Sequence, residues 1–243
     1  MSDEGQRVLA LPGPHFSSVY DLENDGLRLS DGSVIRVKPE GNAGRGTAWD
    51  VWDCSVLAAL HLDQNASNLA PGPGNATVEL GSGTAVAGLT ACARLLCTVV
   101  LSDHPDALPQ VQRSVEHSGF SARSSLHVLS LDWYEGFNTL TERLHELGIH
   151  NVGLLLAADC VWLEQLVPPF VNVLANTVKH HNCRCLIAHQ KRSERVDGRL
   201  KHELASYGFS LKQLEQPSGA SGAAHVRARL YELVAANDSE ASD

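Results

Sequence analysis

The 243-residue chain lacks an excess of basic residues, and this narrows the class of partner it can bind. The sequence contains 19 lysines and arginines and 28 aspartates and glutamates, which gives a formal net charge of −9 at pH 7. Domains that bind nucleic acid usually carry a basic patch or stripe. We therefore expect no nucleic-acid partner, whereas an acidic surface suits a basic protein partner.

Long apolar runs are also missing. No uninterrupted apolar segment approaches the roughly 20 residues that span a bilayer, and the N-terminal residues Met1–Arg7 contain no basic stretch leading into an apolar run, as a secretory signal would. We expect a soluble, cytoplasmic protein with no membrane partner. We also expect the protein to be a monomer.

Paired cysteine motifs of the kind that bind zinc are absent. The six cysteines are scattered through mostly apolar surroundings, at positions 54, 92, 97, 160, 183 and 185. Cys183-Arg-Cys185 is at most half of a metal site, because no second pair has a suitable spacing. We expect reduced, buried cysteines and no bound metal.

What the chain does contain is enough apolar residues, 43%, for one large core. Residues 1–48 are predicted to form an N-terminal β extension, with extended segments at Phe16–Tyr20 and Ser33–Val37 and turns at Asn24–Gly26 and Asp31–Gly32. Residues 49–236 form the main domain, and residues 237–243 are an acidic tail.

From Thr77 onward, segments of strand and helix character alternate. Strands are expected over 77–80, 98–102, 125–131, 152–158, 184–189, 209–215 and 226–234. Helices are expected over 52–63, 84–96, 106–118, 138–147, 166–180 and 194–207. Five strand–helix units predict an α/β, doubly wound, mostly parallel seven-stranded sheet, and the last two strands, which have no helix between them, predict an antiparallel hairpin at one edge.

A glycine turn, Gly81-Ser82-Gly83, follows the first strand of this series. Ligands in such sheets bind at the carboxyl ends of the strands. The dinucleotide motif G-x-G-x-x-G requires a third glycine, but Val86 stands there and the next glycine is Gly88. Glu79, just before the turn, would repel a diphosphate and tolerate a cationic sulfonium ligand, so S-adenosylmethionine is favoured. An NAD-dependent enzyme, or a tight turn without a ligand, remains an alternative.

Three carboxylates and two tryptophans end the following strands. Asp103 can accept hydrogen bonds from both ribose hydroxyls, and Asp132 with Trp133 can bind and pack against adenine. Asp159 and Trp162 are placed where a transferred methyl group would meet its acceptor. The simpler alternatives are that Trp133 only covers the sheet edge and that Asp159 only caps the next helix.

In this order, these motifs resemble the seven-strand S-adenosylmethionine-dependent methyltransferases, in particular methyltransferase family 16, whose members methylate lysines of translation elongation factors, chaperones and related proteins. The similarity extends from about Trp49 to Val234. It implies a cofactor site lined by Trp52, Gly81, Ser82, Gly83, Asp103, Trp133 and Ala158, with Asp159 and Trp162 bordering the acceptor channel; Glu79 and Asp132 complete our predicted cofactor residues.

The chain departs from the family pattern at two positions. Trp162 stands where the family often has tyrosine, and Ser114 falls where an asparagine is usual. In addition, Trp49-Asp50 mimics Trp52-Asp53; we assign the family motif to the second pair because the apolar helix begins directly after it.

The expected function is methylation of a lysine in a protein substrate such as a translation factor or chaperone. Two alternatives stay open, a small-molecule amine methyltransferase and an inactive module that only binds a partner. Enzymes that methylate nucleic-acid bases usually carry an Asn/Asp-Pro-Pro-aromatic segment after the fourth strand. This chain has Asp159-Cys-Val-Trp162 there instead.

Overall fold

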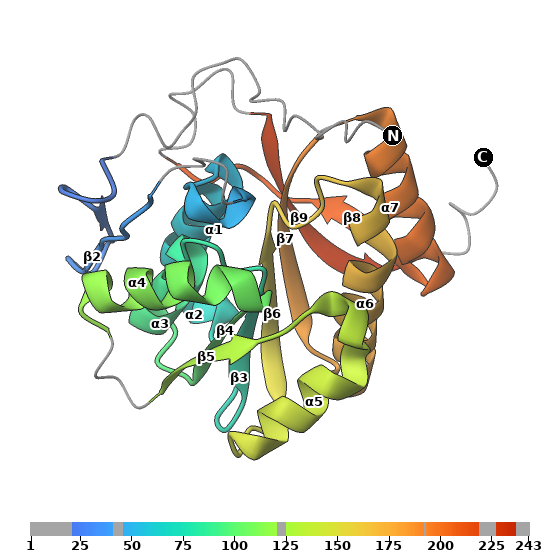
Figure 1. Ribbon diagram of the computed structural model, residues 1–243, viewed down its shortest axis with the longest axis horizontal. Helices are drawn as coiled ribbons and strands as arrows, with labels where there is room; N and C mark the ends of the chain where they lie inside the picture. The colour runs from blue at the N-terminus through green and yellow to red at the C-terminus, as the bar shows by residue number, and fades with distance from the viewer. Residues whose placement is uncertain (1–20, 41–45, 121–124, 192, 219–226, 237–243) are drawn as a thin grey trace, which may run out of the picture.

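Seven strands form the central sheet of the computed structural model, in the order β5-β4-β3-β6-β7-β9-β8 (Figure 1). The structure describes residues 21–40, 46–120, 125–191, 193–218 and 227–236. The strands of this sheet are β3 (Ala76–Leu80), β4 (Val99–Asp103), β5 (Leu126–Ser130), β6 (Val152–Ala158), β7 (Arg184–Gln190), β8 (Phe209–Gln213) and β9 (Ala228–Ala235).

Strands β3 to β7 run parallel, and β9 is antiparallel to both of its neighbours, β7 and β8. Glu232 of β9, for example, lies opposite Leu186 of β7 and Lys212 of β8. The predicted fold class and the terminal antiparallel hairpin are confirmed. The strand order reverses between β3 and β6, so the carboxyl ends of these two strands form the switch point at which α/β sheets bind ligands.

Two layers of helices cover the sheet (Figure 1). One face carries α1 (Asp53–Gln64), α3 (Val86–Arg94) and α4 (Leu108–Ser118), and the other carries α5 (Gly136–Glu146), α6 (Val167–His181) and α7 (Glu194–Ser206). Each predicted helix is present within a few residues of its expected bounds. A short helix, α2 (Ala66–Leu69), was not expected from the sequence.

Alternation along β3 divides its residues between the two layers. Val78 and Leu80 pack in the core shared with α5, α6 and α7, and Glu79 points to the opposite face, against Gly88 of α3. A Cβ atom at Gly88 would lie 2.2 Å from Leu101 Cδ2 and 2.4 Å from Glu79 Oε2. Gly88 therefore allows α3 to pack closely on the sheet, a role that the dinucleotide motif gives to its third glycine.

Short 3₁₀ turns shape the carboxyl end of the sheet. They are η2 (Thr47–Trp49), η3 (Pro105–Ala107), η4 (Trp133–Glu135) and η5 (Glu164–Leu166). The last three follow β4, β5 and β6, so each places its residues just beyond a strand end. This is the end of the sheet at which the predicted site residues were expected.

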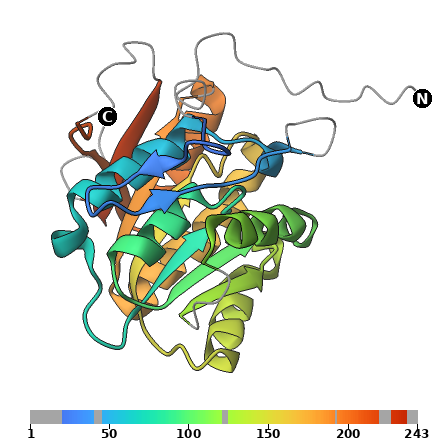
Figure 2. The same ribbon diagram turned by 90° about the vertical axis from the view of Figure 1, so that its left-hand side faces the viewer.

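An N-terminal hairpin, β1 (Leu27–Arg28) and β2 (Val34–Ile35), lies over the helices of the α1/α3 layer (Figure 2). The predicted segment Ser33–Val37 contains β2. The predicted segment Phe16–Tyr20 lies outside the described residues, as does the tail from 237 to 243. Within the described residues, the strand that pairs with β2 follows the turn at Asn24–Gly26, a pairing that the sequence analysis did not anticipate.

Arg94 of α3 fastens this hairpin to the helices. Its Nε lies 2.7 Å from Asp63 Oδ1 of α1, and its NH1 lies 2.9 Å from Asp31 Oδ2 of the hairpin turn. Ser30 completes the cluster, because its backbone N and Oγ donate to the Asp63 carboxylate at 2.8 and 2.9 Å. The hairpin is thus joined to α1 and α3 by an ion-pair network as well as by apolar packing.

The six cysteines form no disulfide, and all six are among the described residues; five are buried and Cys97 is partly buried. Among the described residues, no group of three or more histidine, cysteine or acidic side chains has the geometry of a metal site. No helix in the described ranges combines the length and the apolar character needed to cross a membrane.

Candidate active site

The turn after β3 adopts a backbone that favours glycine. Gly81 and Gly83 have φ angles of +65° and +52°, a region that other residues rarely enter. A Cβ atom at Gly81 would also lie 3.0 Å from Cys160 Sγ and 3.1 Å from the Trp133 ring. Trp133 after β5 and Cys160 after β6 thus pack directly against the turn and leave little room for a side chain at position 81.

Asp103, at the end of β4, is fixed by two backbone amides. Gly83 N donates to Asp103 Oδ2 at 2.7 Å, and His104 N donates to Oδ1 at 2.7 Å. Burial raises the pKa of the Asp103 carboxyl, and these two hydrogen bonds oppose that rise. Each carboxylate oxygen keeps a second acceptor direction, so the group can still receive two ligand hydroxyls in a fixed geometry.

Glu79 differs from the other predicted cofactor residues, because it lies beneath the glycine turn and does not line the cavity. Burial raises the pKa of its carboxyl to about 8, opposed by the nearby Ser82 side chain and Gly88 amide. At neutral pH the isolated carboxyl is therefore mostly protonated. The argument from charge in the sequence analysis must be corrected: a neutral Glu79 does not by itself repel a diphosphate.

Asp132 and Trp133 stand beyond the end of β5. Asp132 Oδ1 accepts a hydrogen bond of 3.0 Å from Tyr134 N and so caps η4, while its Oδ2 lies 3.7 Å from His104 Nε2. The Trp133 ring packs edge-on against Phe170 of α6, with ring centroids 5.1 Å apart. Packing against the core thus holds the Trp133 ring beside the glycine turn.

Asp159 follows β6 in an unusual backbone conformation. Its φ is +55°, which non-glycine residues adopt mainly where the surroundings enforce it, and its N donates to Ala188 O of β7 at 2.8 Å. The neighbouring Cys160 donates from Sγ to Leu80 O at 3.0 Å. The segment that carries Asp159 and Trp162 is therefore tied to both neighbours of β6.

The segment before α1 closes the remaining side. Helix α1 begins at Asp53, directly after Trp52, as expected, and Trp52 Nε1 donates to Thr47 O at 2.7 Å. Trp49 is buried, with the Arg113 guanidinium 6.0 Å from its ring centroid. The main chain of Ala48 lies over Gly83, because a Cβ there would be 3.4 Å from Ala48 O.

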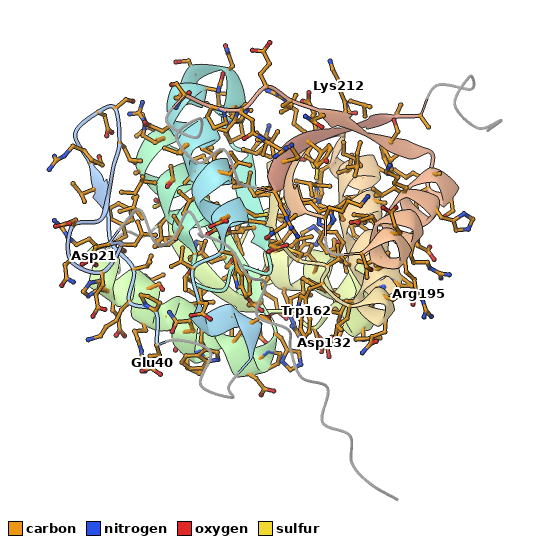
Figure 3. All side chains as sticks on the ribbon, turned by 90° about the horizontal axis from the view of Figure 1, so that it is seen from above. Asp21, Glu40, Asp132, Trp162, Arg195 and Lys212 are labelled. Atoms are coloured by element: carbon orange, nitrogen blue, oxygen red, sulfur yellow. The ribbon has the colours of Figure 1, made fainter. Side chains whose placement is uncertain are left out.

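These elements enclose one cavity of about 400 Å³, a size typical of small-molecule and cofactor sites. Ten of the eleven predicted site residues line it: Trp52, Gly81, Ser82, Gly83, Asp103, Asp132, Trp133, Ala158, Asp159 and Trp162. Figure 3 shows two of them, Asp132 and Trp162, close together, with Lys212 away from them on β8. Residues from the ends of four strands, together with Trp52 before α1, are thus brought together in one cavity.

The sequence analysis missed several lining residues. Trp49 was set aside in favour of Trp52, yet both line the cavity; other lining residues not predicted include Thr47, Ser55, Thr84, His104, Asp106, Tyr134, Cys160 and Leu166. The duplicated Trp-Asp pair was the available signal for Trp49. Thr84, His104, Asp106, Tyr134 and Cys160 follow predicted strand ends by two to four positions, so listing every residue of those loops would have found them, whereas Thr47 and Ser55 lie beside the Trp-Asp pairs.

Ser114, the second departure from the family pattern, does not line the cavity. It is buried in α4, where Gln110 Nε2 donates to its Oγ at 3.2 Å and to Lys38 O at 3.0 Å. This side chain therefore belongs to the contact between α4 and the N-terminal segment.

Comparison with known proteins identifies the family. The model of a family described as lysine methyltransferase matches residues 30–202. A protein N-lysine methyltransferase METTL21A of Danio rerio is 29% identical over 182 residues, covering 72% of this chain and 74% of that protein. A protein N-terminal and lysine N-methyltransferase, efm7, of Aspergillus fumigatus is 27% identical over 135 residues, covering 53% of this chain.

The chain spans only half of the length of the Aspergillus fumigatus relative. Among solved structures, a ribosomal protein L11 methylase from Lactobacillus delbrueckii superposes with a TM-score of 0.55 at 11% identity, over 88% of this chain and 92% of that one; at this identity the likeness concerns the fold alone. The superposition confirms the methyltransferase fold expected from the sequence. The family match supports the expected S-adenosylmethionine cofactor, and the chain belongs to the lysine methyltransferase family.

Proposed function

We propose that this protein methylates the ε-amino group of a lysine in a protein substrate, with S-adenosylmethionine as the methyl donor. One observation supports this most strongly: a single cavity at the switch point of the sheet contains the fixed carboxylate of Asp103, the open glycine turn and the pair Asp159 and Trp162. The cofactor, when bound, supplies an electrophilic methyl group on a cationic sulfur.

The residues present suit this cofactor. Gly81 and Gly83 line the cavity with positive φ angles, and at these two positions no side chain stands between the backbone and a ligand. We assign ribose binding to Asp103 and adenine binding to Asp132 and Trp133. Gly81, Ser82, Gly83, Trp52 and Ala158 would form the remaining cofactor contacts, and Glu79 would act from beneath the turn.

A lysine must lose a proton before it can attack, since its reference pKa is about 10.4. Removal of water from around an ammonium group lowers this pKa, and the walls formed by Trp162 and Leu166 provide an apolar surface for the lysine stem. Asp159 is buried at the same cavity, so we assign it the role of orienting the amine. Catalysis on this scheme consists mainly of positioning.

The proposal also covers the substrate, the oligomeric state and the compartment. A protein substrate fits the acidic chain, and we propose a cytoplasmic monomer that acts on a translation factor, a chaperone or a similar protein and does not act on nucleic acid. Recognition would involve the N-terminal extension and the segment after β7, where Lys191 pairs with Glu194, since loops on a rigid scaffold commonly carry specificity.

The test is transfer from isotopically labelled S-adenosylmethionine into a cell extract depleted of methyltransferases. We expect label in a protein band and, by mass spectrometry, on lysine. Label found only in small metabolites or in nucleic acid would reject the proposal. Asp159→Asn should lower turnover more than cofactor affinity, whereas Glu146→Gln, at an exposed position of α5, should change neither.

A further inference from the structure

One face of α4 binds the segment that follows the N-terminal hairpin. Gln110 Nε2 donates to Lys38 O at 3.0 Å, and His117 Nε2 lies 3.1 Å from Glu23 O. Residues three, four and seven positions apart on a helix lie on the same face. Arg113 follows Gln110 by three positions and precedes His117 by four, so it lies on the face of α4 that meets the N-terminal segment.

Arg113 has two partners at this contact. It forms an ion pair with Glu40, and its guanidinium carbon lies over the Trp49 ring, 6.0 Å from the ring centroid. A guanidinium group can do both at once, because its N–H groups donate in its plane while its face stacks on an aromatic ring. The side chains of Arg113 and Glu40 are 35% and 26% exposed, so solvent screens their attraction only in part.

The turn η2, which ends at Trp49, lies directly against the glycine turn. Ala48 O would be 3.4 Å from a Cβ atom at Gly83, and Thr47 O accepts the hydrogen bond from Trp52 Nε1. All three residues of η2 line the cavity, as does Trp52, whereas Arg113 does not. Arg113 can therefore affect a bound cofactor only by way of the residues that it holds.

The position of η2 depends on its neighbours. It is only three residues long, and no side chain caps its start at Gly46. A 3₁₀ turn of this length has little stability of its own. Its last residue, Trp49, is buried and is the one that Arg113 contacts.

We propose that Arg113 is a positioning residue for the cofactor. It holds Trp49, and with it η2, against the glycine turn, and so slows release of the bound cofactor from the cavity. The role adds to the contacts that the cofactor itself makes, because Arg113 lies outside the cavity. It is also independent of the group that accepts the methyl.

Arg113→Met tests the role, because methionine keeps the apolar stem and removes the charge. Calorimetry with S-adenosylhomocysteine should show a dissociation constant raised about three- to five-fold, the loss expected for one cation–π contact. Stopped-flow tryptophan fluorescence should show that most of the change is faster dissociation. Arg113→Lys, which keeps the charge without the planar group, should lie between the two. An unchanged dissociation constant and rate in Arg113→Met would overturn the proposal.

A second background shows whether Arg113 acts through Trp49. In Trp49→Leu, which lacks the ring, adding Arg113→Met should raise the dissociation constant by less than about 1.5-fold, because the two changes remove the same contact. In Trp49→Phe, whose smaller ring attracts a cation less strongly, the effect should be intermediate; this comparison stands if the Leu variant does not fold. An equal loss in all three backgrounds would refute the route through Trp49.

Arg199→Met is the matched control. Arg199 also pairs with a carboxylate, that of Glu203, but it lies on α7 and does not line the cavity. Its variant should bind and release S-adenosylhomocysteine as the wild type does. Thermal unfolding of the free protein completes the test: a lower unfolding temperature in Arg113→Met with an unaltered dissociation rate would mean a purely structural role and would reject the proposal. No protein substrate enters these measurements, so they stand even if lysine methylation is not found.

Discussion

At the scale of single residues, the site depends on carboxylates whose environments differ. Asp103 is held by two backbone amides and stays open to the cavity, whereas Glu79 lies buried beneath the turn. Both groups end or adjoin the first two strands of the sheet, yet only one can contact a ligand directly. The difference follows from position along the sheet: Glu79 is in register with Leu101 and lies inside β3, whereas Asp103 is two residues further on, at the end of β4.

Asp103→Asn tests the ribose assignment. The amide keeps the shape of the side chain but removes its charge and one acceptor, so affinity for S-adenosylhomocysteine should fall about 10- to 100-fold. Calorimetry measures the affinity, and thermal unfolding shows whether the turn survives. Glu116→Gln, at an exposed position of α4 that does not line the cavity, should change affinity less than about two-fold. Unchanged affinity in Asp103→Asn would remove Asp103 from the cofactor site.

Glu79 gives stability a dependence on pH. Because burial raises its pKa from 4.5 to about 8 in the folded state, the folded protein binds this proton more tightly than the unfolded chain does. Its contribution is fully present below pH 4.5 and is lost as pH rises toward 8. Relative to Glu79→Gln, the wild type should therefore lose about 1 kcal/mol or more of unfolding free energy between pH 5 and pH 8, measured by urea denaturation; parallel pH profiles would contradict this.

At the scale of elements, the close contact between α3 and β3 depends on one glycine. A methyl group at Gly88 would overlap Leu101 and Glu79, so Gly88→Ala should destabilise the protein by about 1–3 kcal/mol, as overpacking does. Gly198 of α7 has open space around its Cβ position, and Gly198→Ala should stabilise by about 0.5–1 kcal/mol. Urea denaturation of both variants measures the contrast, and a neutral Gly88→Ala would show that α3 can shift.

The sequence predicted these elements well because periodicity, turn residues and strand length agreed along residues 76–235. The sequence also predicted most of the site, because the carboxyl ends of parallel strands meet at one edge of the sheet. This holds whichever face each helix covers. It could not place Glu79 beneath the turn, because the sequence does not tell which face of β3 meets α3. It also could not decide between Trp49 and Trp52, because Trp49 ends the short 3₁₀ turn η2 and Trp52 follows it, and both side chains reach the cavity.

At the scale of the whole molecule, the N-terminal hairpin is joined to the sheet domain by the network around Arg94. In sequence, the hairpin precedes the segment that carries Trp49 and Trp52, two residues that line the cavity. Arg94 and Asp63 are largely buried, with side chains 19% and 10% exposed. Loss of one partner in such a pair leaves a carboxylate without its cation.

Arg94→Met should destabilise the protein by about 1–3 kcal/mol. This is less than the loss of one partner of a fully buried pair would cost, because Ser30 still donates to Asp63. Hydrogen exchange of residues 27–37 should become faster, since the hairpin loses its ionic attachment. Arg199→Met removes a pair with Glu203 whose arginine is 42% exposed, and its effect should stay below about 0.5 kcal/mol. Unaltered exchange in the hairpin would show that apolar packing alone holds it.

The position of β9 has a consequence for how the chain is made. This strand is the last of the described strands in sequence, yet it lies between β7 and β8 and is hydrogen-bonded to both. Until residues 228–235 leave the ribosome, one edge of β7 would therefore have unpaired backbone N–H and C=O groups. Strand β8 would have no partner in the sheet. Translation that stops before residue 228 would release a chain with two unsatisfied strand edges, a form inclined to associate with other copies.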